Sequence, residues 1–383
     1  MALSYIRPTS LQGHFDCTAF FSETEGEQNG HYLRRTLSPE WFPQSGVQLT
    51  WPHEGTDWAY MLDEVTDCYV RLAFEIAKRE PLLIVAPDVE AVKKLLDEKL
   101  PQRATAQIRY FECPTNDTWA RDHGFLTVVS ADGAELLDFR FNGWGGKFEA
   151  ALDNAINARL VASKDAPVLR GNYKDCLDFE LEGGSIETDG YGTLLTTSEC
   201  VLNANRGVLP QGLERTKETV ENVLSERLGV DHFLWLDHGY LAGDDTDSHI
   251  DTLARLCPDD TIVYVKCTDS ADEHYEALKA MEEQLATFRT PKGEPYRLLP
   301  LPMASAIYDE DGERLPATYA NYLVVNGAVL YPTYAQSEND AKAADVIRQA
   351  FPGFEVVGVD CRALIRQHGS LHCATMQFPR GVM

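Results

Sequence analysis

Cys373 has the clearest potential for covalent chemistry in this sequence, because a cysteine thiolate is a strong nucleophile. It lies near the C-terminus in an apolar run, Leu371–Phe378, which we predict to be the last strand of the chain. Three other segments carry groups that could position and protonate a substrate: Asn116–Asp122, Leu181–Ser185 and His249–Asp251. Cysteine, histidine and several acids at these spacings make a poor metal set, but they suit nucleophilic attack on a cation.

His249 and Asp251 stand two residues apart, so both side chains would project from the same face of a strand. A carboxylate beside an imidazole fixes its tautomer and makes it more basic, which suits a proton shuttle. A histidine tied to an acid at the surface would show the same spacing. His372 directly precedes Cys373 and would point to the opposite face of the predicted strand, so we do not assign it as the general base.

Two further acids stand in surroundings that fit a site. Glu182 precedes a Gly-Gly pair, which removes side chains where a ligand or a neighbouring backbone comes close, although a lone Glu-Gly-Gly is also common in turns. Asp122 follows Arg121, so an ion pair between these neighbours is the alternative to a role in a site. Trp119 suits either the core or a wall against a planar cation.

Together these groups suggest a guanidinium substrate. A guanidinium is planar, cationic and forked, and it matches two carboxylates through paired N–H···O contacts. Acids that clamp its nitrogens would hold its carbon for attack. The positive charge of the substrate would also stabilise a nearby thiolate, which matters because a free thiol has a pKa of about 8.5.

Helix-like and strand-like segments alternate along the chain, which predicts a mixed α/β fold. Apolar residues recur at helical spacing over Asp63–Lys78 and Leu213–Leu228, and Gly229 is expected to end the second helix. A Ser-x-x-Asp pattern predicts a third helix, from Ser337 to Phe351.

Two strand signals stand out between these helices. Leu82–Ala86 is typical of a buried strand, and Asn326-Gly327 between two short apolar runs predicts a hairpin. No Pro- or Ser-rich linker divides the chain, so we expect one catalytic domain over residues 37–383. Residues 1–36 are polar and irregular, and we expect them to form an N-terminal extension or edge segment.

The chain has 60 acidic and 34 basic residues, a formal net charge of −26 at pH 7. Such a field repels nucleic acid and anionic lipid and favours cationic ligands, although an acidic surface also serves solubility. Nine cysteines without Cys-x-x-Cys spacing indicate reduced thiols. No stretch approaches the ~20 apolar residues that span a bilayer, and no secretory pattern stands at the N-terminus, so we expect a cytoplasmic protein. The sequence leaves a homo-oligomer open.

The segments that carry these residues resemble a known family. In chain order they are Trp51–Trp58, Asn116–Asp122, Leu181–Gly190, Leu194–Thr197, Asp244–Asp251, Asn326-Gly327 and Gly369–Cys373. They are similar to the motifs of agmatine deiminase and the bacterial, porphyromonas-type peptidylarginine deiminase, in the guanidino-group-modifying (pentein) superfamily. The resemblance runs from about Leu37 to Pro379.

This resemblance implies a pentein fold, an α/β propeller of five ββαβ modules around a pseudo-fivefold axis, with the active site in its central channel. By motif, Cys373 is the expected nucleophile and His249 the expected general acid and base. Asp122 and Asp251 are expected to bind the guanidinium, and Glu182 to bind or orient beside His249. Three further residues are expected to line the site and bind substrate: Trp119, Asn321 and Asp117.

The implied reaction is hydrolytic deimination without metal or cofactor. Agmatine would give N-carbamoylputrescine and ammonia through a covalent thiouronium, with a small cationic guanidino compound as the expected partner. A peptidylarginine deiminase is the first alternative, and free-arginine deiminase and amidinotransferase share the same core. A guanidinium-binding pentein without activity is the alternative from another class.

The sequence departs from the family pattern in two places. Phe125 stands where the family often has proline, and Gln367–Ser370 stands where it often has a glycine run. Both departures concern the rim of the expected site and the end that would bind the substrate tail.

Overall fold

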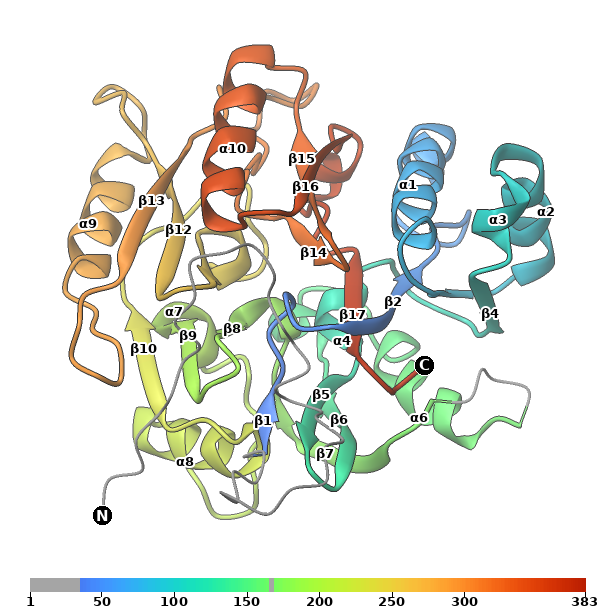
Figure 1. Cartoon of the computed structure of the whole chain (residues 1–383), viewed down its shortest axis with the longest axis horizontal. Coiled ribbons are helices and arrows are strands. Elements are labelled where there is room, and N and C mark those ends of the chain that lie inside the picture. The colour runs from blue at the N-terminus through green and yellow to red at the C-terminus, as the bar shows by residue number, and fades with distance from the viewer. Residues whose placement is uncertain (1–34, 165–168) are drawn as a thin grey trace.

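The computed structural model describes residues 35–164 and 169–383. Within these ranges the strands form five sheets, and every sheet contains the same three-strand unit (Figure 1). The central strand of each unit pairs antiparallel with one neighbour and parallel with the other. A helix links the central strand to its parallel partner, because a parallel pair needs a crossover connection. The α/β prediction is therefore confirmed.

The strands fall into three groups by their place in this unit. The central strands are β2 (Gln44–Thr50), β6 (Gly133–Arg140), β9 (Thr193–Thr197), β12 (Thr261–Lys266) and β15 (Ala328–Thr333). Their antiparallel partners are β17 (Thr375–Pro379), β5 (Leu126–Ser130), β8 (Ile186–Thr188), β11 (Ala254–Cys257) and β14 (Leu323–Val325). Their parallel partners are β3 (Leu82–Ala86), β7 (Asn172–Glu180), β10 (His232–Leu236), β13 (Arg297–Pro302) and β16 (Glu355–Asp360). Two sheets carry an added edge strand, β4 (Ile108–Glu112) or β1 (Thr36–Leu37).

The crossover helices lie around the outside of the molecule, whereas β17 and the short helix α4 lie near its middle (Figure 1). The crossover helices are α1 (Leu62–Ala77), α6 (Ile156–Ala162), α8 (Lys217–Leu228), α9 (Tyr275–Leu285) and α10 (Ser337–Ala350). The other α-helices of the described ranges are α2 (Val89–Lys99), α3 (Gln102–Thr105), α4 (Ala120–His123), α5 (Gly143–Gly146) and α7 (Ser198–Val201). Among these described helices, none is long and apolar enough to cross a bilayer.

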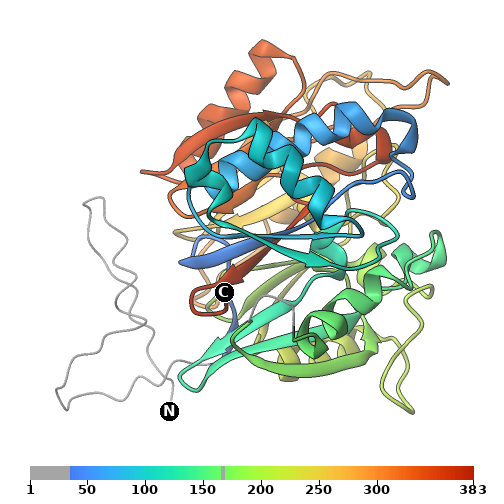
Figure 2. The same cartoon turned by 90° about the vertical axis from the view of Figure 1, so that its right-hand side faces the viewer.

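The C-terminal strand β17 joins the sheet that begins with β2, so the two ends of the fold are paired (Figure 2). Thr375 lies opposite Leu49 in this antiparallel pair. The turn that carries Cys373 is consequently held against the first sheet and near α4, whose Arg121 N–H donates to the Cys373 carbonyl at 3.1 Å.

Several local predictions are confirmed. α1 covers nearly the whole segment predicted from Asp63, and β3 has the predicted bounds. α8 starts at Lys217, later than predicted, and ends at Gly229, which is left-handed (φ 70°) as a helix-ending glycine should be. β14 and β15 form the predicted hairpin, with Gly327 at φ 74°.

The predicted strand placement of the candidate site residues is wrong. β17 begins only at Thr375, so Cys373 lies in the turn before the strand rather than on it. His249 caps a single 3-10 turn, η5 (Ile250–Thr252), so the alternation of side chains along a strand does not apply to His249 and Asp251. Asp122 lies on the short helix α4. The predicted extension, residues 1–36, lies outside the described residues except for its last two, and the division into an extension and one domain stays a prediction.

Candidate active site

The turn that carries Cys373 is fixed by Asn321, which lies just ahead of β14. The Asn321 Oδ1 accepts the backbone N–H groups of His372 (2.9 Å) and Cys373 (3.2 Å). Its Nδ2 lies 3.2 Å from the Cys373 Sγ, within reach of an N–H···S hydrogen bond. The thiol is buried, and its sulfur lies 3.8 Å from the Asp251 Oδ2. Asn321 therefore positions the nucleophile candidate and contacts its sulfur directly.

Asp122 is held from two sides by neutral donors. Its Oδ1 accepts the backbone N–H of Gly184 at 3.0 Å, and its Oδ2 accepts the indole N–H of Trp144 at 3.0 Å. Trp144 sits in the glycine-rich turn of α5 with a left-handed backbone (φ 55°), an uncommon conformation for a bulky residue. Each carboxylate oxygen keeps a lone pair for a further donor. Arg121 makes no ion pair with this carboxylate, because its guanidinium turns away to Glu40 at 3.1 Å.

His249 and Asp251 bring polar atoms into the same buried space. The Asp251 Oδ2 accepts a hydrogen bond from the His372 Nδ1 at 2.7 Å, whereas its Oδ1 has no hydrogen-bond partner among the described residues. Within the same residues, both ring nitrogens of His249 also lack a hydrogen bond. The His249 Nδ1 lies 3.6 Å from the Asp122 Oδ1. Buried polar atoms are normally paired, so these three atoms mark a place for a ligand.

Gly184 is the point on which these groups converge. A Cβ added to Gly184 would lie 2.6 Å from the His249 Nδ1, 2.8 Å from the Asp122 Oδ1 and 3.2 Å from the Asp251 Oδ2. A Cβ on the preceding Gly183 would lie 2.1 Å from the Arg121 carbonyl oxygen. The Gly-Gly pair thus has the close-approach role expected of it, and the groups that approach belong to α4 and η5.

Glu182 lies beside His249 but is paired with a cation of its own. Its Oε1 accepts the Nε–H of Arg206 at 3.0 Å, and this arginine is fully buried. Glu182, Cys200 and His249 also place one possible metal-ligand atom each within 4.8 Å of one another. A metal ion fits this set poorly, since the Arg206 guanidinium occupies the carboxylate and would repel a second cation.

The remaining predicted residues form the wall next to this cluster. The Asp117 Oδ2 accepts the indole N–H of Trp119 at 3.1 Å, and its Oδ1 accepts that of Trp58 at 3.2 Å. The Trp119 ring packs on Gly369, where an added Cβ would lie 2.3 Å from the ring. Asp117 therefore holds two tryptophans in place, and its contact with substrate stays a prediction.

Burial sets the protonation of the free site. Burial, reinforced by the charges of Asp251 and Asp122, raises the pKa of the Cys373 thiol well above its usual range. Burial lowers the pKa of His249 to about 3, so its imidazole is neutral at pH 7. Burial, with the Asp251 and Glu182 charges, raises the pKa of Asp122 well above its usual value. A positive charge entering the site would lower the raised pKa values of Cys373 and Asp122 toward their usual range, whereas it would keep His249 neutral.

The pKa of Asp251 is shifted in the opposite direction to that of Asp122. Burial alone would raise the pKa of Asp251, but the hydrogen bond and charge of His372, with the charges of His249 and Arg255, bring it below the usual value. The two predicted guanidinium-binding acids therefore have opposite electrostatic surroundings. Asp251 is the ionised partner, and Asp122 is the one that lacks a cation.

Comparison with known proteins shows the family of this chain. The sequence model of the Porphyromonas-type peptidyl-arginine deiminase family matches residues 36–379. The chain belongs to this family. A curated Marinomonas sp. protein named "Putative agmatine deiminase" is 32% identical, over 88% of this chain and 92% of its own length.

Solved structures agree with this assignment. A Porphyromonas gingivalis protein, described as a "Putative Arginine Deiminase", is 53% identical with a TM-score of 0.83, over 91% of this chain and 99% of that one. The C. jejuni agmatine deiminase, solved as a cysteine-to-serine variant with substrate bound, is 36% identical with a TM-score of 0.81, over 94% and 100% of the two chains. The α/β fold is that of agmatine deiminase structures.

The structure brings Cys373, His249, Asp122, Asp251 and Glu182 together, with Asn321 on the sulfur. Three residues that support this cluster were missed from the sequence: Trp144, His372 and Glu40. Trp144 had a usable signal, since it interrupts a run of glycines that no regular helix explains. His372 was set aside because a strand was assumed there. Glu40, which contacts His372, stands at the start of the described chain without a local pattern to reveal it.

Proposed function

We propose that this deiminase-family protein hydrolyses the guanidino group of agmatine to N-carbamoylputrescine and ammonia. The observation that carries the proposal is the buried cluster of one thiol, one unpaired imidazole and two carboxylates with accepting oxygens to spare. A guanidinium offers planar N–H donors to such oxygens and a carbon for the thiol to attack. The acids act as hydrogen-bond acceptors, so the carbon needs no metal to activate it.

In the first half-reaction the guanidinium nitrogens donate to Asp122 and Asp251. The Cys373 thiol gives its proton to His249 as its sulfur bonds to the guanidinium carbon; the C–N bond then breaks, and His249 passes that proton to the leaving nitrogen, which departs as ammonia. In the second half-reaction His249 accepts a proton from water, whose oxygen bonds to the same carbon. The C–S bond then breaks as the proton of the new hydroxyl goes to sulfur, which releases the ureido product and restores the thiol, and His249 returns to its neutral form by losing its proton to solvent. The intermediate is a covalent thiouronium on Cys373.

In the free site the proposed nucleophile, Cys373, is kept in its unreactive, protonated form. The raised pKa of Cys373 means that the thiol is protonated before substrate arrives. The charges that cause part of this shift belong to Asp251 and Asp122, the groups that a guanidinium would pair with. A bound guanidinium would therefore lower the pKa of the thiol next to the carbon that the sulfur attacks.

We also propose that the five three-strand units are the five ββαβ modules of a pentein propeller. Each unit has an antiparallel pair, a parallel pair and a crossover helix, and the 3-10 turn η4 (Gly183–Ser185), α4, η5 and the turn before β17 meet at the site. The proposed compartment is the cytoplasm, because the eight cysteines within the described residues are all buried and unpaired.

Agmatine is favoured over arginine by the charges around the site. Arginine carries a carboxylate that would need a base, and Arg121 and Arg206 are both buried against acids of their own. An unpaired carboxylate in this site would cost several kcal/mol, on the order of a thousandfold in specificity.

A second candidate is deimination of arginine or peptidylarginine, which two findings favour. The P. gingivalis relative that is 53% identical is named for arginine. Lys147 also lies close by, next to the α5 turn that holds Trp144, and is about one-third exposed. Its Nζ contacts the Asp245 carbonyl oxygen at 2.6 Å and the Asp247 carboxylate at 2.8 Å, so a substrate carboxylate would have to displace an acid.

Release of ammonia from agmatine, free arginine and a peptidylarginine decides between these candidates. We expect kcat/KM for agmatine to exceed that for arginine by about a thousandfold, and Cys373→Ser to lose turnover while keeping its fold. Equal turnover of arginine that falls in Lys147→Ala would favour the second candidate. A wild-type protein that releases ammonia from none of the three would refute the proposed function.

A further inference from the structure

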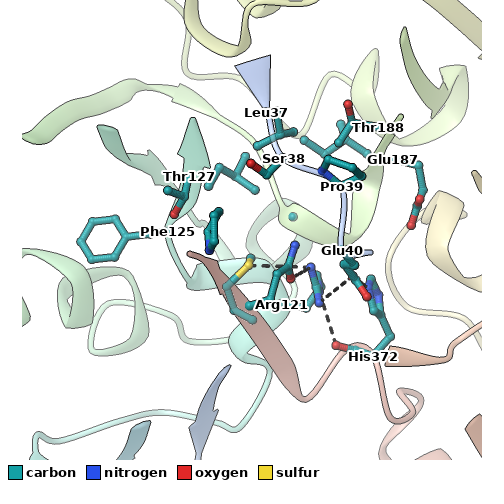
Figure 3. A pocket seen from close by; sticks show the side chains of 16 residues that line it. Leu37, Ser38, Pro39, Glu40, Arg121, Phe125, Thr127, Glu187, Thr188 and His372 are labelled. Carbon is teal, nitrogen blue, oxygen red and sulfur yellow. Dashed lines mark hydrogen bonds and ion pairs between the residues drawn. The ribbon is translucent and has the colours of Figure 1, made fainter. Parts of the chain in front are cut away.

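A second buried group of charges surrounds His372, the residue before the proposed nucleophile, and Figure 3 shows His372 beside Glu40 and Arg121. It borders a cavity of about 40 Å³ lined in part by Glu40, Arg121, Glu187 and His372. His372 is 1% exposed, and its backbone N–H is held by Asn321. This histidine therefore has a fixed place between the proposed active site and the cavity.

Both ring nitrogens of His372 face carboxylates. The Nδ1 lies 2.7 Å from the Asp251 Oδ2, and the Nε2 lies against the Glu40 Oε1. A neutral imidazole has a single N–H, so it could satisfy one of these acceptors while its other nitrogen directed a lone pair at a carboxylate oxygen. An imidazolium donates to both. The Arg255 Nη2, which is 3.1 Å from the Nε2, also lies 3.3 Å from Glu40, so that carboxylate offers the arginine an alternative acceptor.

The charges of the group agree with an imidazolium. Three carboxylates face two guanidinium groups and this histidine, so the described charges balance if His372 is protonated: Glu40, Glu187, Asp251, Arg121, Arg255 and His372. Burial raises the pKa of Glu187, but the Arg255 Nε–H donates directly to its carboxylate, which favours the ionised form. The charges of His372, Arg121 and Arg255 outweigh burial and hold the pKa of Glu40 far below its usual range.

We propose that His372 is a positioning residue: Glu40 holds it as an imidazolium, and it fixes the Asp251 carboxylate, ionised and with one oxygen open, for the guanidinium. This inference rests on the proposed function, because Asp251 needs a substrate to receive. It assigns the two acids of the site different supports, a buried cation for Asp251 and neutral N–H donors for Asp122. Glu40 acts on Asp251 indirectly, by holding His372.

The test compares His372→Asn and Glu40→Gln with wild type over a range of pH. Asparagine can place an N–H near the Nδ1 position, so it keeps a donor for Asp251 and removes the positive charge. We expect kcat/KM for agmatine at about pH 7 to fall on the order of 10- to 100-fold in His372→Asn and in the same direction in Glu40→Gln. His232→Asn is the matched control, since His232 is part-exposed on β10 and contacts the Arg289 carbonyl oxygen at 2.8 Å, outside this group and the proposed site.

The pH profile separates positioning from a structural role. Without the imidazolium the pKa of Asp251 rises, so the loss is expected to be largest near pH 6 and to shrink as pH increases. Cys373, His249 and Asp122 also face Asp251, and their side chains are unchanged in these variants. A ratio that stays constant with pH would assign the loss to structure alone and overturn the proposal.

A measurement without substrate keeps this inference distinct from the proposed function. Nitrogen NMR of histidine-labelled protein, with the His372 signals identified by their absence in His372→Asn, reports the proton on each ring nitrogen. We expect both nitrogens to carry a proton at about pH 7. A neutral His372 at this pH refutes the imidazolium even if agmatine is turned over. A protonated His372 in a protein that turns over no guanidino compound would instead count against the proposed function.

Discussion

Gly184→Ala is expected to disable the site by adding one methyl group. The new Cβ would lie 2.6 Å from the His249 Nδ1, whereas ordinary contacts of such an atom begin near 3.4 Å. The imidazole and the glycine backbone must therefore separate by about 0.8 Å, and the Asp122 Oδ1, at 2.8 Å, must also move. The backbone of Gly184 is not in the left-handed region, so the effect comes from the Cβ and not from backbone strain.

The size of the effect follows from this displacement. A misplacement of about 1 Å in a catalytic geometry costs on the order of a hundredfold in rate, which corresponds to about 2.7 kcal/mol. The methyl group also overpacks a buried site, which typically costs about 1–3 kcal/mol of stability. We therefore expect kcat/KM for agmatine to fall at least about a hundredfold, while the protein still folds with a lowered melting temperature.

Steady-state release of ammonia and thermal melting by circular dichroism measure these two effects separately. Gly207→Ala is the matched control, because Gly207 is also outside the left-handed region and its nearest neighbour to an added Cβ, the Ala204 carbonyl oxygen, is at an ordinary 3.5 Å. Wild-type kcat/KM in a folded Gly184→Ala protein would refute the argument that His249, Asp122 and Asp251 act together around this glycine.

Three further predictions test the supports of the site. Trp144→Phe removes the indole donor to Asp122. Because one hydrogen bond to a charged group is worth about 1.5–3 kcal/mol, kcat/KM should fall about 10- to 100-fold with little change in melting temperature. An unchanged kcat/KM would contradict a role for this donor. Arg206→Met leaves Glu182 buried without its cation and should cost about 3–5 kcal/mol in denaturant unfolding, and a loss below about 1 kcal/mol would show that the pair is not needed. Prolonged chelation should change neither activity nor melting temperature, and activity lost on chelation and restored by one metal would overturn the mechanism.

The sequence identified the reactive groups because their types are rare and chemically distinctive. Cys373, His249, Asp122 and Asp251 were found in this way, and the structure brings all four to Gly184 or to the thiol. Local signals with a strong physical basis were also reliable, such as the helix-ending Gly229, whose left-handed backbone few other residues adopt.

Predictions that depended on an assumed strand failed. The expectation that His372 points to the opposite strand face from Cys373 does not apply, because Asn321 binds two successive N–H groups and holds this segment as a turn. No sequence pattern near residue 372 predicts that its hydrogen-bond partner, Asn321, lies 51 positions earlier in the chain. Glu40 is more remote still, 332 positions from the histidine that it contacts. Contacts of this range follow from the pairing of β17 with β2, which is a property of the whole fold.

The buried acids of this protein differ in what neutralises them, and that difference bears on the nature of the substrate. Glu182 has Arg206, Glu40 has Arg121 and Arg255, and Asp251 has His372. Among the described residues, Asp122 accepts hydrogen bonds from the neutral N–H groups of Gly184 and Trp144, and the nearby His249 is uncharged because burial lowers its pKa to about 3. Burial and the neighbouring acids accordingly raise the pKa of Asp122. Because Asp122 shares its buried site with a thiol and an uncharged imidazole, a guanidinium would supply the missing charge, planar donors and an electrophilic carbon together.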